Sequence, residues 1–416
     1  MTEIIAPKGT KDLYLPEIKK WQFIEEQIRQ YFSRFLYQEI RTPIFEYTEL
    51  FYKGTGSESE VVQKEMYTFK DKANRSITLR PENTPSVVRS VLENNLVQEI
   101  VPLRFFYIGP MFRYDKPQKG RYRQFHQFGI EVFGDPSAEV DAEVIFSAFG
   151  FLEEINIQNI ELHINSVGCR QCRPEFLKKL QESAQQKRDE LCEDCQRKIT
   201  TNPLRIFDCK NTHCIEISNH FPKISDYLCP QCHDHFAGVR SALSILEVPF
   251  TSNPRLVRGL DYYTRTVFEI TSVRLGAQDA LLGGGRYDNL FQELGGKEIP
   301  ATGFAAGIER LILHLDQVPD SKKKIICIVF QSPSFKHKAL KLSTYLWKKG
   351  FPVFIDYNAK NMKKQFKKCD RIGADYAFII AEEEISSQSI SIKNLKTTEQ
   401  IQIKSEALDQ WLRENI

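Results

Sequence analysis

The spacing of apolar residues changes near residue 322, and this change divides the chain into two parts that must fold differently. Beyond it, short apolar runs alternate with amphipathic stretches, and each such stretch is followed by a glycine that can end a helix. The expected elements are strands at 325–330, 351–357 and 374–381 and helices at 335–349 and 360–372. Because strands joined through helices lie parallel with right-handed crossovers, residues 322–416 are predicted to form a small α/β domain.

Residues 1–321 show no such alternation. Apolar residues at helical spacing predict a helix over 17–38, and Asp135 followed by Pro136 predicts a helix that starts there and runs to about residue 155. Three segments rich in aromatic and β-branched residues are expected to be strands: 103–109, 124–133 and 261–271. Their irregular spacing favours an α+β fold, in which a mainly antiparallel sheet is flanked by helices.

Positive charge is concentrated after residue 322. Residues 322–371 carry thirteen lysines and Arg371 against Asp356 and Asp370, a net charge of +12, which leaves −9 for the rest of a chain whose total is +3. A basic module on an acidic protein is typical of polyanion binding, and nucleic acid is favoured over a membrane surface.

One face of the helix expected at 360–372 carries much of this charge. Its basic residues are Lys360, Lys363, Lys364, Lys367, Lys368 and Arg371. The opposite face is expected to dock through Met362, Phe366, Cys369 and Ile372. A lysine-rich face is by itself also typical of a helix that is only solvated, but the charge imbalance favours contact with RNA.

No segment marks the chain for export or for a membrane. The N-terminus lacks a basic region followed by an apolar run, and no stretch approaches the ~18 apolar residues of a membrane span. With 41% hydrophobic and 27% charged residues the composition is that of a globular protein, and a cytoplasmic enzyme is expected. In that compartment ten cysteines are expected to be thiols or metal ligands rather than disulfides.

Eight of the ten cysteines fall in pairs between residues 168 and 235. The pairs are Cys169 and Cys172, Cys192 and Cys195, Cys209 and Cys214, and Cys229 and Cys232. The first two pairs match the C-x2-C, C-x2-C spacing of zinc sites and the other two offer a second set of four, but spacing leaves open which pairs share an ion. Reduced thiols are the alternative. A closed four-thiolate site has no open position for catalysis, so any zinc here is expected to be structural.

Three further strings combine glycine with arginine and tyrosine. They are LVRGLDYYTRTVFE at 256–269, GGGRYDNL at 283–290 and GFAAGIERL at 303–311. An arginine beside a glycine, such as Arg258 before Gly259, can approach a phosphate with no side chain intervening. Tyr262 and Tyr263 point to opposite faces if their segment is a strand, so one is expected to line a pocket while the other packs.

A fourth string, MFRYDKPQKGRYRQFHQFGIE at 111–131, predicts a strand, a basic loop and a returning strand. The period of two places Gln127, Gly129 and Glu131 on one face, as a polar pocket wall. The other face, with Phe128, Ile130 and Val132, is expected to be core. No Walker loop, dinucleotide loop or serine or cysteine nucleophile motif occurs in the sequence.

Together these strings resemble the histidyl-tRNA synthetase family, and residues 111–131 are similar to the second signature of class II aminoacyl-tRNA synthetases. The resemblance implies an α+β fold: an antiparallel class II catalytic core over 1–321, with a cysteine-rich helical insertion at 168–235, and an α/β anticodon-binding domain over 322–416. It implies activation of L-histidine to histidyl-adenylate with ATP and Mg²⁺, then transfer to tRNA(His). Pro43 in RTPIFEYTELF resembles the first class II signature, which implies a homodimer.

The resemblance also implies roles for single residues. Arg113, Arg258 and Arg310 are the implied catalytic residues, at the phosphates. The ATP-binding set is Arg113, Asp115, Arg121, Arg258 and Arg310; the histidine-binding set is Glu82, Thr84, Gln127, Glu131, Tyr262, Tyr263 and Tyr287; and Gln118 and Arg123 face the tRNA acceptor end. The chemistry agrees, because a carboxylate that attacks an α-phosphate needs cations to offset charge and needs no general base.

Three residues depart from the family pattern. Asn83 and Pro85 flank Thr84 where the family commonly has small residues, and Asp115 stands where a glutamate usually faces the adenine. A histidine-sensing regulatory paralogue without catalysis is the chief alternative, but such proteins typically lose the phosphate-binding arginines and the final domain, which this chain keeps. A zinc-dependent RNA-binding protein would need none of the pocket residues.

Overall fold

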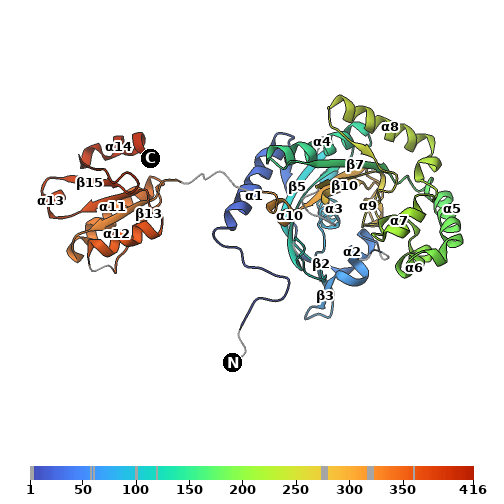
Figure 1. The fold of residues 1–416 in the computed structure, drawn as a ribbon, viewed down its shortest axis with the longest axis horizontal. Helices are drawn as coiled ribbons and strands as arrows, with labels where there is room; N and C mark the ends of the chain where they lie inside the picture. Colours follow the sequence, from blue (N-terminus) through green and yellow to red (C-terminus); the bar gives the residue numbers. More distant parts are fainter. Residues whose placement is uncertain are drawn as a thin grey trace. The chain divides into compact units, whose positions relative to one another are not determined.

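The computed structural model describes residues 4–56, 59, 61–98, 102–118, 120–272, 280–315, 323–358 and 361–416. The chain forms two compact units, Met1–Val318 and Pro319–Ile416 (Figure 1). The boundary predicted at 321/322 lies in the segment 316–322, which is outside the described residues. Lys360, which was predicted to lie on the basic helix face, is also outside them. Within the described part of the chain, no helix is both long enough and apolar enough to span a membrane.

A large, mainly antiparallel sheet forms the centre of the first unit, as predicted. In spatial order its strands are β1 (Gln38–Glu39), β5 (Leu103–Phe112), β6 (Gln124–Phe133), β11 (Ala301–Gly307), β10 (Ala280–Arg286), β9 (Thr264–Ser272), β7 (Ile160–Ser166) and β8 (Thr251–Ser252). The pairs β1–β5 and β7–β8 at the two edges are parallel, and the pairs between them are antiparallel.

The two faces of this sheet have different neighbours. One face packs on α1 (Ile18–Ser33), α4 (Ala138–Glu154), α8 (Pro230–Ile245) and α10 (Ile308–Ile312). Phe128, Ile130 and Val132 of β6 are buried in this core, as their alternation predicts. The other face packs on α3 (Thr84–Glu93) and α9 (Leu290–Glu293), and part of it stays polar. The chemistry of the molecule is therefore confined to one face.

The helix predicted from Asp135 begins later than expected. Helix α4 starts at Ala138, and Ser137 is its N-cap. The carboxylate of Asp135 instead accepts the backbone N–H of Ser137 at 2.8 Å. A side chain that turns the backbone two residues ahead of a helix has the same sequence signature as a cap, so the predicted start was wrong.

Residues 168–235 are helical, as predicted for the insertion. Their helices are α5 (Arg173–Gln186), α6 (Glu193–Thr201) and α7 (Thr212–Ser218), followed by the first turns of α8. The insertion leaves the sheet after β7 and returns through α8 to β8. A small separate sheet lies elsewhere in the unit, in the order β2 (Phe45–Tyr47), β4 (Ser76–Leu79), β3 (Tyr67–Lys70), beside α2 (Thr48–Gly54).

The second unit is the predicted α/β domain with two additional strands. Its sheet has the order β13 (Val353–Ile355), β12 (Ile326–Phe330), β14 (Tyr376–Ile380), β15 (Ser389–Asn394) and β16 (Gln400–Lys404), and its helices are α11 (Lys336–Lys348), α12 (Met362–Arg371), α13 (Glu382–Ser386) and α14 (Leu408–Asn415). Strands β12, β13 and β14 are parallel. Strands β15 and β16 extend the sheet antiparallel and were not predicted.

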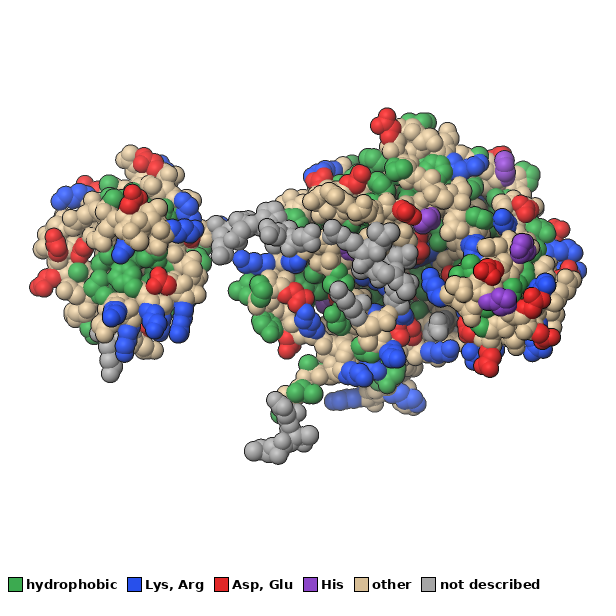
Figure 2. Space-filling view, viewed as in Figure 1, with side chains coloured by type: hydrophobic (Ala, Val, Ile, Leu, Met, Phe, Trp, Pro, Cys, Tyr) green, Lys and Arg blue, Asp and Glu red, His purple; other side chains and the backbone are tan. Residues whose placement is uncertain are grey.

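Helix α12 presents its basic residues to solvent, as predicted. Figure 2 shows lysine and arginine side chains gathered on the side of the unit where Figure 1 draws α12. Its inner face differs from the expectation in two residues. Ile372 is 38% exposed, whereas Gln365 is buried and exchanges hydrogen bonds with the backbone of Phe330. A buried amide is tolerated because both its polar atoms are paired.

Arg286 of GGGRYDNL lies in the core rather than at a ligand. Its side chain is fully buried and contacts the carboxylate of Asp141 in α4 at 2.8 Å and that of Asp288 at 3.1 Å. Asp141 also pairs with His235 of α8 at 2.8 Å. Burial opposes ionisation of Asp141, but Arg286 and His235 outweigh it and hold its pKa at about 2. The network therefore ties the end of β10 to two helices.

The variant Arg286→Ala is expected to lose about 3–5 kcal/mol of unfolding free energy at pH 7, because Asp141 remains buried without its main partner. The pKa of Asp141 is depressed, so its contribution is present above about pH 4 and is lost as the pH falls toward 2. Denaturant unfolding at several pH values measures both effects. The control is Arg34→Ala. This variant breaks an exposed ion pair with Glu154 of α4, the helix that also carries Asp141, and is expected to cost under about 1 kcal/mol. Equal losses in the two variants contradict this account.

Candidate active site

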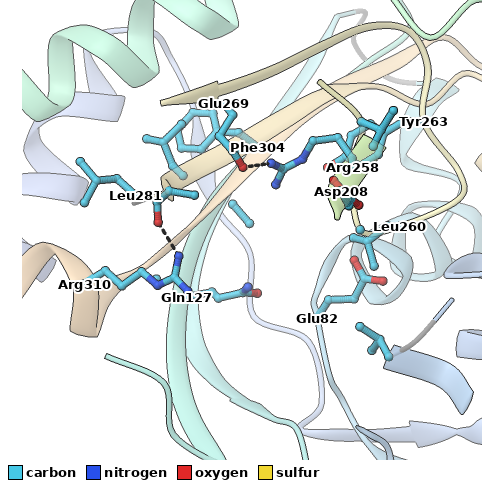
Figure 3. A pocket seen from close by; sticks show the side chains of 18 of the residues that line it. Glu82, Gln127, Asp208, Arg258, Leu260, Tyr263, Glu269, Leu281, Phe304 and Arg310 are labelled. Atoms are coloured by element: carbon cyan, nitrogen blue, oxygen red, sulfur yellow. Dashed lines mark hydrogen bonds and ion pairs between the residues drawn. The ribbon is translucent and has the colours of Figure 1, made fainter. Parts of the chain in front are cut away.

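A cleft of about 640 Å³ opens on the polar face of the large sheet (Figure 3). Strands β5, β6, β9, β10 and β11 contribute its floor. Its walls come from residues after β4, which include Glu82 and Thr84, and from residues 253–263 before β9. One end is built from carboxylates and tyrosines and the other from arginines, so the cleft has two ends of different chemistry.

Glu131 lies at the centre of the first end. It is 1% exposed and accepts hydrogen bonds from the hydroxyl of Thr84 at 2.7 Å and from that of Tyr287. Burial raises the pKa of Glu131 to about 8, against the opposing effect of these two hydrogen bonds. The carboxyl group thus tends to hold a proton at neutral pH, which suits a ligand that can share one, such as an imidazole.

Glu82 is the second buried carboxylate of this end. It accepts hydrogen bonds from the hydroxyls of Thr55 at 2.6 Å and Tyr262 at 2.9 Å. Burial raises its pKa. Nearby, Oε1 of Gln127 is buried and has no hydrogen-bond partner among the described residues, although its side chain lines the cleft. An unsatisfied acceptor and a buried carboxylate together fit a ligand that brings N–H donors, such as an ammonium group.

Tyr262 and Tyr263 do not point to opposite faces, so that prediction was wrong. Strand β9 begins only at Thr264, and both tyrosines lie in the turn before it. Both are buried and line the cleft, with ring centroids 4.7 Å apart. The alternation of a strand does not apply to a turn. Tyr262 holds Glu82 in place, and Tyr263 lines the cleft beside it.

Five arginines line the cleft. Arg255 donates to the insertion, and the other four form the opposite end of the cleft: Arg113, Arg121, Arg258 and Arg310. Burial lowers the pKa of Arg310, and the charges of the other three lower it further. Each guanidinium has an anchor: Arg113 donates to the carbonyl of Pro81 at 2.9 Å, and Arg310 donates to that of Ala280. Cations held this close repel one another, and a polyphosphate is the ligand that relieves this repulsion.

Arg258 is held by residues that sequence reasoning did not single out. Its guanidinium forms an ion pair with Glu269 of β9, as Figure 3 shows. It also lies against Gly283 of β10, where an added Cβ would come within 2.4 Å of the guanidinium carbon. Nε of Arg258 has no partner in the described part of the chain and remains available to an anion. Two features of the sequence could have indicated these contacts of Arg258: the glycine run at 283–285 and the alternation of residues along β9.

Only some of the site residues predicted in the loop between β5 and β6 line the cleft. Asp115 lines the cleft and forms an ion pair with Arg121. Gln118 and Arg123 do not line it. Gln118 closes a tight turn with Arg121 through two backbone hydrogen bonds, and the guanidinium of Arg123 lies 4.1 Å from the ring centre of Tyr114. Lys119 is outside the described residues.

Asn83, which departs from the family pattern, has a clear structural role. It is buried, and its side-chain oxygen accepts hydrogen bonds from Thr42 at 2.7 Å and from Arg80 at 3.1 Å. Arg80 in turn donates to the backbone of Thr42 at 3.0 Å and of Pro110 at 2.9 Å. The asparagine thus fixes the segment that carries Glu82 and Thr84.

The cysteines of the insertion form two sets of four. We name Cys169, Cys172, Cys229 and Cys232 the first cysteine set, and Cys192, Cys195, Cys209 and Cys214 the second cysteine set. Within each set the sulfurs all lie within 4.8 Å of one another. The two C-x2-C pairs that match zinc spacing in sequence therefore fall into different sets. Folding decides the pairing, because α5 and α8 bring residues 172 and 229 together.

Comparison with known proteins decides the family. A model of the histidyl-tRNA synthetase family matches residues 9–206 and 223–311, and an anticodon binding domain model matches residues 324–415. The chain belongs to the histidyl-tRNA synthetase family. The two matches leave out residues 207–222, which include two cysteines of the second cysteine set.

Relatives and solved structures agree with this assignment. A histidine–tRNA ligase of Halothermothrix orenii is 47% identical over 405 residues, which cover 96% of this chain and 97% of that protein. One from Desulfitobacterium hafniense is 46% identical over 99% of this chain and 98% of that protein. The apo histidyl-tRNA synthetase of S. aureus, 36% identical, superposes with a TM-score of 0.84 and covers 98% of this chain and 99% of that chain. These matches give no support to the regulatory alternative.

The position of Arg258 depends on Gly283, which gives a test within the cleft. The variant Gly283→Ala is expected to slow ATP-dependent amino-acid activation by about 10-fold or more, because the new methyl group displaces the guanidinium of Arg258. Arg258→Ala is expected to slow it roughly 100-fold. If Gly283 acts through Arg258, the double variant is no slower than Arg258→Ala alone, as single-turnover kinetics can show. Additive losses contradict that link.

Proposed function

We propose that the chain activates L-histidine with ATP to form histidyl-adenylate and transfers the histidyl group to tRNA(His). The observation that carries this proposal is the cleft itself. It joins buried carboxylates and hydroxyls at one end to four arginines at the other, in a chain of the histidyl-tRNA synthetase family. That arrangement holds an amino acid and a triphosphate end to end.

The arginines supply the electrostatics of activation. A carboxylate oxygen of histidine attacks the α-phosphorus of ATP, and the bond to the bridging oxygen breaks as pyrophosphate leaves. Arg113 and Arg258 are assigned to the α-phosphate and Arg310 to the far end of the triphosphate; Arg121 and Asp115 complete the ATP-binding set. Preorganised cations of this kind stabilise charge as it develops, at no cost of reorganisation. Mg²⁺ that accompanies ATP would neutralise further phosphate charge.

Histidine is selected at the carboxylate end. Glu82, Thr84 and Gln127 are assigned to the α-ammonium group, and Glu131, Tyr263 and Tyr287 to the imidazole. Tyr262 contributes by orienting Glu82. A substrate without an imidazole leaves these buried groups unpaired, and that penalty rejects it more strongly than pocket size could.

The second step involves tRNA(His). Gln118 and Arg123, on the loop outside the cleft lining, are assigned to the acceptor end, and the second unit with its basic helix α12 is assigned to the anticodon region. Phosphate contacts by lysine supply affinity through counterion release.

A homodimer is proposed from the small sheet. It and its neighbours expose a group of large apolar side chains, each 45–57% exposed: Ile44, Phe45, Tyr47, Tyr52 and Phe69. The group adjoins Pro43 of the first class II signature. Exposed apolar patches of this kind mark interfaces, and a second copy of the chain is the proposed occupant. Sedimentation of the wild type against Phe45→Glu tests this, since an unchanged mass would exclude the patch.

Zinc is proposed as the ligand of both cysteine sets. The sulfurs of Cys169 and Cys172 are 3.6 Å apart, and those of Cys192 and Cys209 are 3.9 Å apart. A tetrahedral ion with Zn–S bonds near 2.3 Å requires sulfurs about 3.8 Å apart. Backbone N–H groups donate to the sulfurs of Cys172 and Cys214, and these bonds oppose the burial that raises the pKa of both thiols. The described cysteines are free thiols, which fits the reducing cytoplasm proposed as the location.

Pyrophosphate exchange into ATP, run with each amino acid in turn, tests the proposed activity. Exchange is expected with L-histidine and not with the other amino acids, and the activated product is expected to charge tRNA(His). Absence of exchange with histidine overturns the proposal, and exchange with a different amino acid overturns the assigned specificity.

The variant Glu131→Gln is expected to raise KM for histidine about 10-fold or more while KM for ATP changes little, because the carboxyl group that can share a proton with the imidazole is lost. The same variant tests the raised pKa of Glu131. Its pKa near 8 when folded, against an ordinary value near 4.3 when unfolded, means that the wild type loses stability as pH rises from about 4.3 to 8. The Tm of Glu131→Gln relative to wild type should therefore rise between pH 5 and pH 8. Equal changes in both KM values contradict the assigned role.

Reversing charge on α12 tests the proposed tRNA contact in the full-length chain. Lys363→Glu combined with Lys367→Glu is expected to raise KM for tRNA(His) about 10-fold and to leave pyrophosphate exchange unchanged. The slope of log binding constant against log salt concentration is expected to fall by about one for each substituted lysine. The control is Lys404→Glu with Arg413→Glu, which reverses two exposed charges elsewhere on the same unit. Similar losses in both double variants would show that net charge, not this face, matters.

A further inference from the structure

The insertion forms part of the wall of the active-site cleft. Four consecutive residues of it line the cleft: Phe207, Asp208, Cys209 and Lys210. Cys209 belongs to the second cysteine set. Asp208 lies beside Arg258 in Figure 3, and its negative charge acts on that guanidinium together with the charge of Glu269. Cys209 is therefore close to the arginine end of the cleft in space, although it is 49 residues from Arg258 in the sequence.

Side chains also bind the insertion to the segment that carries Arg258. Arg255, three residues before it, donates from Nη1 to Ser218 at 2.6 Å and to the carbonyl of Ile215 at 3.2 Å, and from Nη2 to the carbonyl of Phe207 at 3.2 Å. From the other direction, Arg205 of the insertion donates to the carbonyl of Gly259, the residue after Arg258. The same guanidinium holds Asp208 at 2.7 Å.

Apolar packing joins the same two regions. Val257, immediately before Arg258, is buried in the core of the insertion, which also contains Phe207 and all eight paired cysteines. Leu256, one residue earlier, is buried in the core beneath the large sheet. Residues 253–263 contribute no strand to the sheet. The position of Arg258 thus depends on two cores at once, and one of them is built around cysteine.

A core of this kind is small and is interrupted by thiols. Helices α6 and α7 are only nine and seven residues long, and their sulfurs Cys195 and Cys214 are buried at the centre of the packing. Short helices around a small core usually need a metal or a disulfide to be stable. The sulfurs of the second cysteine set are spaced for an ion rather than for disulfides.

We propose that a zinc ion in the second cysteine set positions the catalytic segment: it holds residues 205–215 in place, and through Arg205, Arg255 and Val257 these residues hold Arg258 at the α-phosphate. The proposal rests on the proposed function of the cleft. Arg205, which does not line the cleft, and Arg255, which does, are both positioning residues, and the metal takes no part in the reaction. A misplacement of about 1 Å in a group that acts on the transition state can cost roughly 100-fold in rate. Loss of this ion therefore slows adenylate formation itself, before any tRNA is involved.

The test uses the full-length protein and three measurements: zinc per chain by elemental analysis, single-turnover formation of histidyl-adenylate, and binding of tRNA(His). The wild type is expected to contain two zinc ions per chain. Cys214→Ser is expected to contain one, to form adenylate about 10-fold or more slowly, and to bind tRNA with little change. A variant that has lost one zinc ion and forms adenylate at the wild-type rate overturns the proposal.

Two variants that keep all cysteines separate positioning from unfolding. Arg205→Ala and Arg255→Ala are each expected to retain both zinc ions and an unchanged Tm of the main transition, to lower kcat for pyrophosphate exchange about 10-fold, and to raise KM for ATP more than KM for histidine. Arg205→Lys is expected to recover part of the rate, since lysine can still donate to the carbonyl of Gly259. The control is Arg197→Ala on α6, whose 74% exposed side chain pairs with Asp194, and it is expected to match the wild type.

The outcomes distinguish this inference from the proposals beneath it. A wild type that contains zinc but exchanges no pyrophosphate with histidine overturns the proposed function. A wild type that activates histidine but contains no zinc overturns the role of the metal. Normal activation by both Arg205→Ala and Arg255→Ala overturns the positioning link, even if zinc is present.

Discussion

Mutual repulsion among the arginines of the cleft is the constraint on which the rest of the site depends. Arg113, Arg121 and Arg258 all act on Arg310, whose pKa is lowered by burial and by their charges. Side chains under such repulsion move apart unless they are held. Each one has an anchor: Arg113 a carbonyl before α3, Arg310 a carbonyl at the start of β10, and Arg258 the carboxylate of Glu269 on β9. Arg121 pairs with Asp115 of the loop between β5 and β6. The large sheet supplies the rigidity that keeps these anchors in register.

The opposite end of the cleft presents the complementary problem, which is two carboxylates removed from water. Glu82 and Glu131 would be costly to bury as bare charges. Hydroxyl groups from Thr55, Thr84 and two tyrosines satisfy their oxygens, and burial raises the pKa of both. These carboxyl groups can therefore share a proton with a ligand and accept hydrogen bonds from its N–H groups. The two ends together select a substrate that is basic at one end and carboxylate-bearing at the other.

The insertion supports the segment 253–263, which forms no strand. Residues 253–263 carry Arg258 and two tyrosines of the cleft but lie outside the sheet, so packing on one side would leave them loose. Leu256 enters the core under the sheet and Val257 enters the cysteine-rich core, so the backbone is clamped from both sides. Two sets of four thiols lie in this core among its apolar side chains.

Local periodicity and spacing identified several main elements of this protein, but not strands β15 and β16 or the start of α4. The alternation along β6 placed Gln127 and Glu131 on the cleft, helical spacing placed the core of α1, and paired cysteines marked the insertion. Tertiary structure alone decided how distant segments meet. It joined Cys172 to the pair at 229 and 232 rather than to that at 192 and 195, turned both Tyr262 and Tyr263 into the cleft, made Asp135 a turn residue, and brought Cys209 and Asp208 to the wall beside Arg258. The physical reason is that periodicity reports only the face a residue occupies within its own element. Contacts between segments tens of residues apart depend on packing, because the entropy of loop closure changes too slowly with length to favour one partner over another.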